Sequence, residues 1–485
     1  MAKKWYAYLF RENIYGFSVQ AVSFVAGILS TVIFPNLLGK DGFGYFSIVI
    51  GVASIGTFFC DIGIPAALLK FIPAGLKEGV AWKYYELLFS WKLLASSATA
   101  LAAFLLADAI AGAYGLPGLA DGLRLGAAFL LPYAMLPFFE NAFIGLKKAR
   151  TTFVMDCAFH VGRIALPLLL FLAVGVGYLA AVAGNLIGCG IAVAIGWFLA
   201  SREPLLKRSA NAVIDSRALK GYVVFGVIWM IALALIQWSD LLIIGLFRPV
   251  SDVSVYRVAW LWATATAFLF PFSQKIFFAA HAHEDDARSR AVFSLTLKYG
   301  LAFAFLMIAG IALVAAQFLS LLYSGAYDEA YPVMIVLSML TIDITLSTLA
   351  SGLLTGKGDI RTPTAIHAVA GVAQVVLLFA VIPAFGMLGA AAVVVLVRVA
   401  AAIAQTGFAL RFLSLRIPAS YVYMPALCAI ITALLLLPLR EYTFSFPLAL
   451  AYGTMLVALY GLLATLLRVV DLREIGAVVR GSVAR

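Results

Sequence analysis

Charge is the scarcest property of this sequence. Only 12% of its 485 residues are charged, whereas a soluble domain has about a quarter. Acidic residues are rarer than basic ones, 23 against 34, while hydrophobic residues make up 64% and the mean hydropathy is +1.05. This balance excludes a large soluble domain. It predicts an integral membrane protein whose apolar runs nearly fill the chain.

Cysteines and catalytic motifs are equally scarce. The four cysteines, Cys60, Cys157, Cys189 and Cys428, lie inside apolar runs, which favours buried packing residues over a disulfide framework or a metal cluster. No phosphate-binding loop motif is present, so ATP is not the expected energy source. The outer loops are too short for the catalytic acids of a membrane-embedded glycosyltransferase or polymerase. We therefore expect no enzyme, and no cofactor beyond a coupling ion, H⁺ or Na⁺.

The apolar runs predict an all-α polytopic fold with about fourteen transmembrane helices. The predicted spans are 15–38, 43–66, 84–107, 123–146, 152–173, 177–200, 220–247, 253–280, 292–323, 331–354, 362–382, 387–410, 419–439 and 446–468.

Basic residues lie almost entirely on one side of these spans. The opposite loops hold only Lys40, Arg124, Arg248 and Arg440. This asymmetry follows the positive-inside rule and predicts a multi-pass protein of the cell inner membrane with both termini in the cytoplasm.

Two halves of the chain resemble each other. GLKKARTT at 145–152 resembles GKGDIRTP at 356–363 at an offset of 211, GYLAA at 177–181 resembles GMLGA at 386–390 at an offset of 209, and Tyr45 corresponds to Tyr256. Six spans in each repeat give both halves the same orientation. They predict two six-helix lobes related by a pseudo-two-fold axis along the membrane normal, with a cavity between them.

The repeat defines the predicted domains. They are an N-terminal lobe at 1–200, a cytoplasmic linker at 201–218, a C-terminal lobe at 219–412, and two extra helices with a cytoplasmic tail at 413–485.

The fifth span carries a polar stripe that its apolar neighbours do not explain. Asp156, His160 and Arg163 are spaced four and then three residues apart and share one helix face. Charges inside a bilayer usually face a protein-lined or hydrated interior. The repeat places His367 and Gln374 at the positions of Asp156 and Arg163. We interpret both stripes as cavity walls that bind substrate, although an Asp156–Arg163 pair that holds helices together is the alternative.

Further basic residues within spans are candidates for binding an anion. Arg398 lies midway along the twelfth span, and a guanidinium can hold a phosphate with two parallel hydrogen bonds. A pairing with Asp343 of the tenth span is an equal alternative. Arg257 and Lys275 lie nearer the ends of the eighth span, where either could instead reach the interface.

Buried carboxylates and one histidine are the candidates for ion coupling, because protonation or ion binding changes their charge. These residues are Asp156, His160, Glu140, Asp240 and Asp343. Asp61, near the cytoplasmic end of its span, is interpreted as interfacial. The run HAHEDD at 281–286 is interpreted as a solvated loop rather than a metal site.

Several stretches resemble the polysaccharide (O-antigen type) flippase branch of the multidrug/oligosaccharidyl-lipid/polysaccharide exporter superfamily. They are NLLGKDGFGYFSIV at 36–49, CDIGIPAALLKFIPAG at 60–75, SDLLIIGLF at 239–247, VYRVAWLWATATAFLFPFSQKIFFAA at 255–280 and LLFAVIPAFGMLGAAAVVVLV at 377–397. Leu241 follows Asp240 where the family often has a basic or polar residue.

The resemblance implies a V-shaped pair of lobes around a central cavity. It implies a polyprenyl-diphosphate-linked oligosaccharide as substrate, moved from the cytoplasmic to the outer leaflet by alternating access, with ion-gradient coupling as in an antiporter. Expected partners are the bilayer, a polymerase and other polysaccharide-assembly proteins, and no nucleic acid.

Three other transporters stay open as alternatives. A lipid II-type flippase shares the chemistry of the substrate. A multidrug or ion antiporter of the same superfamily should have cavity acids without basic partners, and Arg163 and Arg398 argue against it. A major-facilitator-type solute transporter would usually have a Gly-x-x-x-Asp-Arg-x-Gly-Arg-Arg-like loop where this chain reads LKFIPAGLKEGV, at 69–80.

Overall fold

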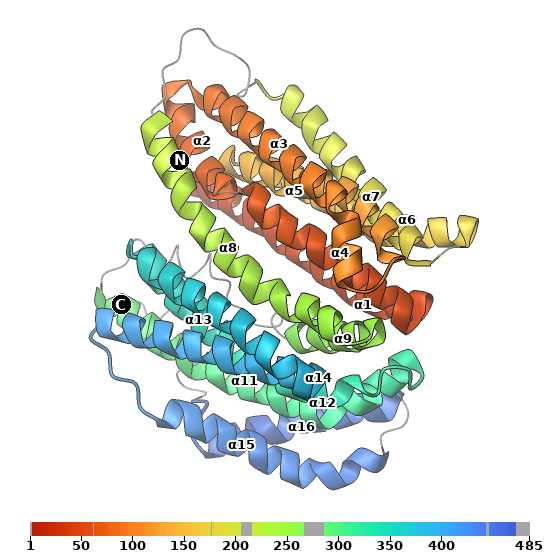
Figure 1. Cartoon of the computed structure of the whole chain (residues 1–485). Helices are drawn as coiled ribbons and strands as arrows, with labels where there is room; N and C mark the ends of the chain where they lie inside the picture. Colours follow the sequence, from red (N-terminus) through yellow and green to blue (C-terminus); the bar gives the residue numbers. More distant parts are fainter. Residues whose placement is uncertain are drawn as a thin grey trace. The chain divides into compact units, whose positions relative to one another are not determined.

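The structure is a computed structural model that describes residues 2–61, 63–175, 177–204, 216–265, 286–442 and 446–471. These residues form helices and turns and contain no strand. Contacts divide the chain into two compact units, Met1–Arg257 and Val258–Arg485. Figure 1 shows the helices of each unit.

The first unit contains eight helices and the beginning of a ninth. They are α1 (Ala2–Asp61), α2 (Ile64–Glu78), α3 (Ala81–Leu105), α4 (Ala107–Ala113), α5 (Leu119–Gly145), α6 (Ala149–Val174), α7 (Gly177–Ser201), α8 (Ser216–Phe247) and the start of α9 (Val250–Ala265).

The second unit contains the rest of α9 and the later helices. They are α11 (Asp286–Tyr323), α12 (Ala330–Ser338), α13 (Leu340–Gly356), α14 (Arg361–Phe412), α15 (Ser420–Leu436), the 3₁₀-helix η3 (Leu437–Tyr442) and α16 (Phe446–Leu466).

Eleven of the described helical stretches are long and apolar enough to cross a membrane. Two of them, within α1 and α14, break at Gly39 and Gly386 and so cover two predicted spans each. The eighth predicted span begins in α9 and continues outside the described residues. The other predicted spans coincide with helices, so the predicted all-α polytopic fold is confirmed.

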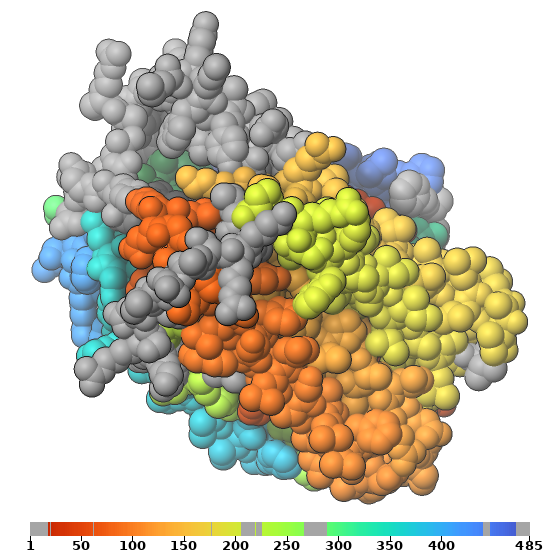
Figure 2. Space-filling model, turned by 90° about the horizontal axis from the view of Figure 1, so that it is seen from above, coloured from red at the N-terminus to blue at the C-terminus, as the bar shows by residue number. Residues whose placement is uncertain are grey.

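The surface of the first unit fits a lipid environment. In the space-filling view, α3, α5, α6 and α7 (orange to yellow) form one continuous face (Figure 2). Large apolar side chains on these helices are exposed, among them Leu105 at 69% and Leu172 at 80%. Exposed apolar area of this extent is stable only against hydrocarbon or a partner, which agrees with a multi-pass membrane protein.

The two motif pairs that predict the repeat share their backbone conformation. Lys147 and Gly358, the third residues of the first pair, are both left-handed, with φ of 59° and 94°. The hydrogen bonds Lys148 N–H to Phe143 O and Asp359 N–H to Leu354 O then match at the offset of 211. Gly177 and Gly386, which begin the second pair, have φ of 42° and 57°. Left-handed residues at corresponding positions, at offsets of 211 and 209, support the repeat.

Small residues let α6 and α7 approach closely. A Cβ on Gly188 would lie 2.8 Å from the backbone carbon of Gly162 and 2.9 Å from the backbone nitrogen of Arg163. Backbone atoms cannot move aside as a flexible side chain can. Glycines at such crossings are the usual device for packing membrane helices. The glycine at 188 therefore fixes the position of Arg163 on α6.

Gly188→Ala is expected to destabilise the first unit by about 1–3 kcal/mol, since an added methyl forces α6 away from α7. Gly190→Ala is the matched control, because its Cβ would meet nothing within 4 Å. Thermal unfolding of the two purified variants tests this expectation. Equal midpoints would show that the close approach at Gly188 is unimportant.

Candidate functional site

The polar stripe of α6 is largely buried in the first unit. Asp156 and His160 are 7% and 8% exposed, and Arg163 is half-buried with its guanidinium 5.7 Å from the centre of the Phe159 ring. In the described part of the chain Arg163 forms no ion pair, and Nδ1 of His160 has no hydrogen-bond partner. The alternative of an Asp156–Arg163 pair is therefore not what the structure shows.

A second arginine approaches the same place from α9. The guanidinium of Arg257 lies 4.8 Å from the Trp238 ring, and its charge interacts with the charge of Arg163. Tyr133 of α5 interacts with both arginines. We call Arg163, Arg257 and Tyr133 the cation cluster. Two like charges held close together repel each other, and a bound anion would relieve that repulsion.

Asp240 of α8 borders the cation cluster. It is 2% exposed, accepts a hydrogen bond of 2.7 Å from the Tyr256 hydroxyl, and interacts electrostatically with Arg257. Its other oxygen accepts a hydrogen bond of 2.9 Å from the backbone N–H of Leu241. Position 241 thus supports Asp240 through its backbone, although its side chain is apolar.

The second unit holds a separate polar network on α13 and α14. Nε and Nη2 of Arg398 each lie 2.9 Å from Oδ2 of Asp343, and Ser347 donates to Oδ1 at 2.8 Å. Between the two sequence-based alternatives for Arg398, the structure shows the ion pair. A role of Arg398 in substrate binding stays a prediction.

The second polar stripe lies on α14 in the same unit. Nε2 of Gln405 lies 2.9 Å from Nδ1 of His367, and Ser351 donates to its Oε1 at 2.7 Å. Gln374 is fully buried. His367 also interacts with the charges of Asp343 and Arg398, so the α14 stripe and the Asp343–Arg398 pair form one network.

Of two further predicted site residues, the structure describes only one. Glu140 is half-buried on α5 and interacts with Cys189. Lys275 and the run at 281–286 lie outside the described residues.

Sequence reasoning missed three residues of the first unit. Tyr133 looked like an ordinary aromatic of an apolar span. Asp61 was interpreted as interfacial, but it accepts a hydrogen bond from Lys92, which is fully buried. The interfacial position of Asp61 stays a prediction, but its pairing with Lys92 was not foreseen. A lysine within an apolar span was the signal that could have revealed it.

Comparisons with known proteins place this arrangement in a family. The family model described as "Polysaccharide biosynthesis protein" matches residues 33–332. The chain belongs to this family. The predicted kinship with the polysaccharide flippase branch is thereby confirmed. No curated protein matches the sequence.

Solved transporters of the superfamily share the fold. The lipid II flippase MurJ in an inward closed conformation matches with a TM-score of 0.66 and 14% identity, over 94% of this chain and 98% of that one. An inward-facing multidrug resistance transporter of the MATE family, within the MOP superfamily, matches with a TM-score of 0.60 and 16% identity, over 81% and 94%. A MOP-superfamily transporter from Pyrococcus furiosus, for which a binding pocket of reverse polarity is described, matches with a TM-score of 0.58 and 16% identity, over 84% and 95%.

Proposed function

We propose that this protein flips a polyprenyl-diphosphate-linked oligosaccharide from the cytoplasmic to the outer leaflet by alternating access. The observation that carries the proposal is the cation cluster, where Arg163 and Arg257 interact without an acidic partner on Arg163 in the described residues. Membership of a polysaccharide biosynthesis family supports the class of substrate.

The chemistry of such a substrate fits the cation cluster. A diphosphate cannot cross about 30 Å of hydrocarbon unless other groups replace its water. Guanidinium groups do so with paired, charge-assisted hydrogen bonds, and the Tyr133 hydroxyl can donate a further one. Asp240 partly offsets the positive charge of Arg257. The cation cluster therefore binds the anion less tightly, and the anion can be released.

The remaining features of transport follow from the residues that carry charge. The distribution of basic residues supports an inner-membrane protein with cytoplasmic termini. Coupling to H⁺ or Na⁺ is assigned to the buried ionisable side chains of Asp156, His160, Glu140, Asp240 and Asp343. A polymerase that elongates the translocated glycan is the expected partner on the outer side. Arg398, Lys275, His367 and Gln374 are proposed as further residues that bind the substrate.

A lipid II-type flippase is the second candidate. It is favoured by the fold shared with MurJ over nearly the full length of both chains, and its substrate is also a lipid-linked glycan. A multidrug antiporter is less favoured, because the cation cluster would repel cationic drugs.

The lipid that accumulates in cells lacking this protein distinguishes the candidates. We expect a polyprenyl-diphosphate-linked oligosaccharide to build up on the cytoplasmic side, detected by mass spectrometry of extracted lipids. Accumulation of lipid II would favour the second candidate. An unchanged lipid profile with increased drug sensitivity would contradict both.

A further inference from the structure

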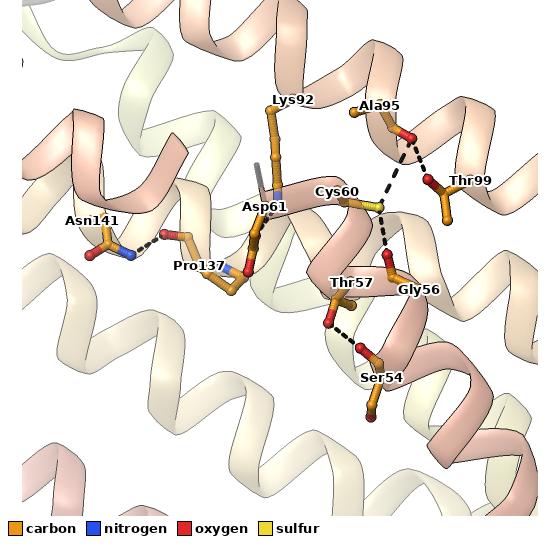
Figure 3. A network of polar contacts seen from close by, with 10 residues as sticks. All are labelled: Ser54, Gly56, Thr57, Cys60, Asp61, Lys92, Ala95, Thr99, Pro137 and Asn141. Carbon is orange, nitrogen blue, oxygen red and sulfur yellow. Dashed lines mark hydrogen bonds and ion pairs between the residues drawn. The ribbon is translucent and has the colours of Figure 1, made fainter. Parts of the chain in front are cut away.

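A buried ion pair joins α1 and α3 in the first unit, and its two residues are not among those assigned to transport. Lys92 of α3 is 0% exposed and donates a hydrogen bond to Oδ1 of Asp61, the last residue of α1. The Asp61 side chain is 15% exposed, so solvent reaches the pair from the carboxylate side only. Figure 3 shows Lys92 extended towards Asp61.

Such a pair is an expensive structural device. Removing two charges from water costs several kcal/mol per ion, and apolar residues of similar volume often stabilise a protein equally well. A buried lysine inside an apolar helix is therefore more often functional than structural. Its ammonium already occupies the position that a metal cation would take beside Asp61, so a proton is the ion that this carboxylate can bind.

Small hydroxyl side chains continue from the pair along both helices. On α1, Ser54 and Thr57 lie seven and four residues before Asp61, and on α3, Ser96 and Thr99 lie four and seven residues after Lys92. These spacings put each set on one helix face with its charged residue. We call these four side chains the hydroxyl seam.

Side chains pack tightly around the hydroxyl seam, and only two of its four hydroxyl groups donate hydrogen bonds within the part of the chain that the structure describes. Cys60 lies between the helices, with Sγ 3.2 Å from Gly56 O and 4.0 Å from Ala95 O. Thr57 donates to Ser54 O at 2.7 Å and Thr99 donates to Ala95 O at 2.8 Å (Figure 3). Ser54 and Ser96 are 3% and 0% exposed. In the described structure their hydroxyl oxygens lie outside hydrogen-bond geometry with any neighbour.

The far end of the hydroxyl seam reaches the cation cluster. Ser54 lies beside the Tyr133 hydroxyl, which interacts with Arg163 and Arg257. Seven residues of helix span about 10.5 Å, which is the rise along α1 from Ser54 to Asp61. The hydroxyl seam therefore leads from the ion pair towards the cation cluster inside the first unit.

We propose that the Asp61–Lys92 pair is a proton-binding site that is coupled, along the hydroxyl seam, to binding of a diphosphate at the cation cluster. One proton from water converts the Asp61 carboxylate to a neutral carboxyl, and Lys92 keeps its ammonium charge. The pair changes from net zero to +1 and attracts the anion. By reciprocity, binding of the anion draws a proton onto Asp61. This inference rests on the proposed function.

The groups that face Asp61 support a simple titration. Lys92 from α3 is the charged group that acts on the carboxylate, and Cys60 on α1 is its titratable neighbour. From α5, Asn141 and Pro137 are neutral, and Asn141 donates to Pro137 O at 2.7 Å (Figure 3).

Calorimetric titration of the purified full-length protein with inorganic diphosphate tests the coupling. Heats measured in two buffers of different ionisation enthalpy give the protons taken up on binding. Wild type is expected to take up more protons than Asp61→Asn and to lose about sixfold more affinity as the pH rises, since one unit charge about 15 Å away at an effective dielectric constant of about 20 has that effect.

Two variants are expected to have opposite effects on the affinity for diphosphate at high pH. Asp61→Asn leaves the ammonium uncompensated, so it should keep the tight, low-pH affinity as the pH rises until Lys92 itself loses its proton. Asp61→Asn with Lys92→Gln has no net charge at the pair and should keep the weak, high-pH affinity. The control, Asp41→Asn, removes an exposed acid and should behave as wild type. Equal proton uptake by wild type and Asp61→Asn would overturn the coupling.

An infrared titration without ligand separates this inference from the proposed function. The band of a protonated carboxyl group is expected to appear as the pH falls in wild type and to be absent in Asp61→Asn. If wild type binds no diphosphate but shows this band, the proposed function fails while the proton site stands without its coupling to diphosphate. If the band is the same in both proteins, the proton site itself is wrong.

Discussion

Replacing Arg163 and Arg257 together with glutamine is expected to reduce transport of the lipid-linked oligosaccharide at least about 100-fold. A hydrogen bond to a charged group contributes about 1.5–3 kcal/mol, so each arginine is worth about tenfold or more in affinity for the diphosphate. Glutamine keeps much of the side-chain volume and a donor but removes the charge. Transport is measured in vesicles loaded with the fluorescently labelled lipid-linked glycan.

Arg411→Gln is the matched control for this double variant. Arg411 is an exposed arginine at the end of α14, 6.0 Å from the centre of the Phe408 ring. It should transport at the wild-type rate. Wild-type transport by the Arg163→Gln, Arg257→Gln protein, inserted at normal levels, would contradict a role of the cation cluster in binding substrate.

Asp343→Asn is expected to cost the second unit about 3–5 kcal/mol of stability, because it leaves the guanidinium of Arg398 buried without its counter-charge. The two side chains are 8% and 16% exposed, so water cannot replace the lost partner well. Thermal unfolding in detergent, with probes placed in the second unit, measures the effect.

The double replacement Asp343→Leu, Arg398→Met separates stability from function. With both charges removed, the stability of the second unit should return close to the wild-type value. If Arg398 also binds substrate, transport by this folded protein stays low. A double variant that is as unstable as Asp343→Asn would show that the ion pair is not what holds α13 to α14.

The fold could be predicted because membrane helices follow simple rules. Every span needs about 20 apolar residues, and the turns between them carry their own signals. The glycines at 39 and 386, both at positive φ, mark breaks that separate predicted spans inside single long helices. The predicted lobes at 1–200 and 219–412 stay predictions. Contacts within the chain divide it into compact units after Arg257.

The site could be predicted only in part, because sequence shows which residues are charged but not which of them meet. Helical spacing was enough to place Asp156, His160 and Arg163 on one face. It could not show that Arg257, on another helix, interacts with Arg163, or that Tyr133 interacts with both. Pairing between helices separated in sequence, as in Asp343–Arg398 and Asp61–Lys92, depends on packing that periodicity does not encode.

The central claim is that the cation cluster takes the place of water around a diphosphate. Binding of a polyprenyl diphosphate and of the uncharged polyprenol of the same length, each measured by titration into the protein in lipid nanodiscs, tests it most directly. We expect wild type to bind the diphosphate at least about 100-fold more tightly than the polyprenol, and the Arg163→Gln, Arg257→Gln protein to bind the two lipids nearly equally. Equal affinities of the wild-type protein for both lipids would contradict the claim.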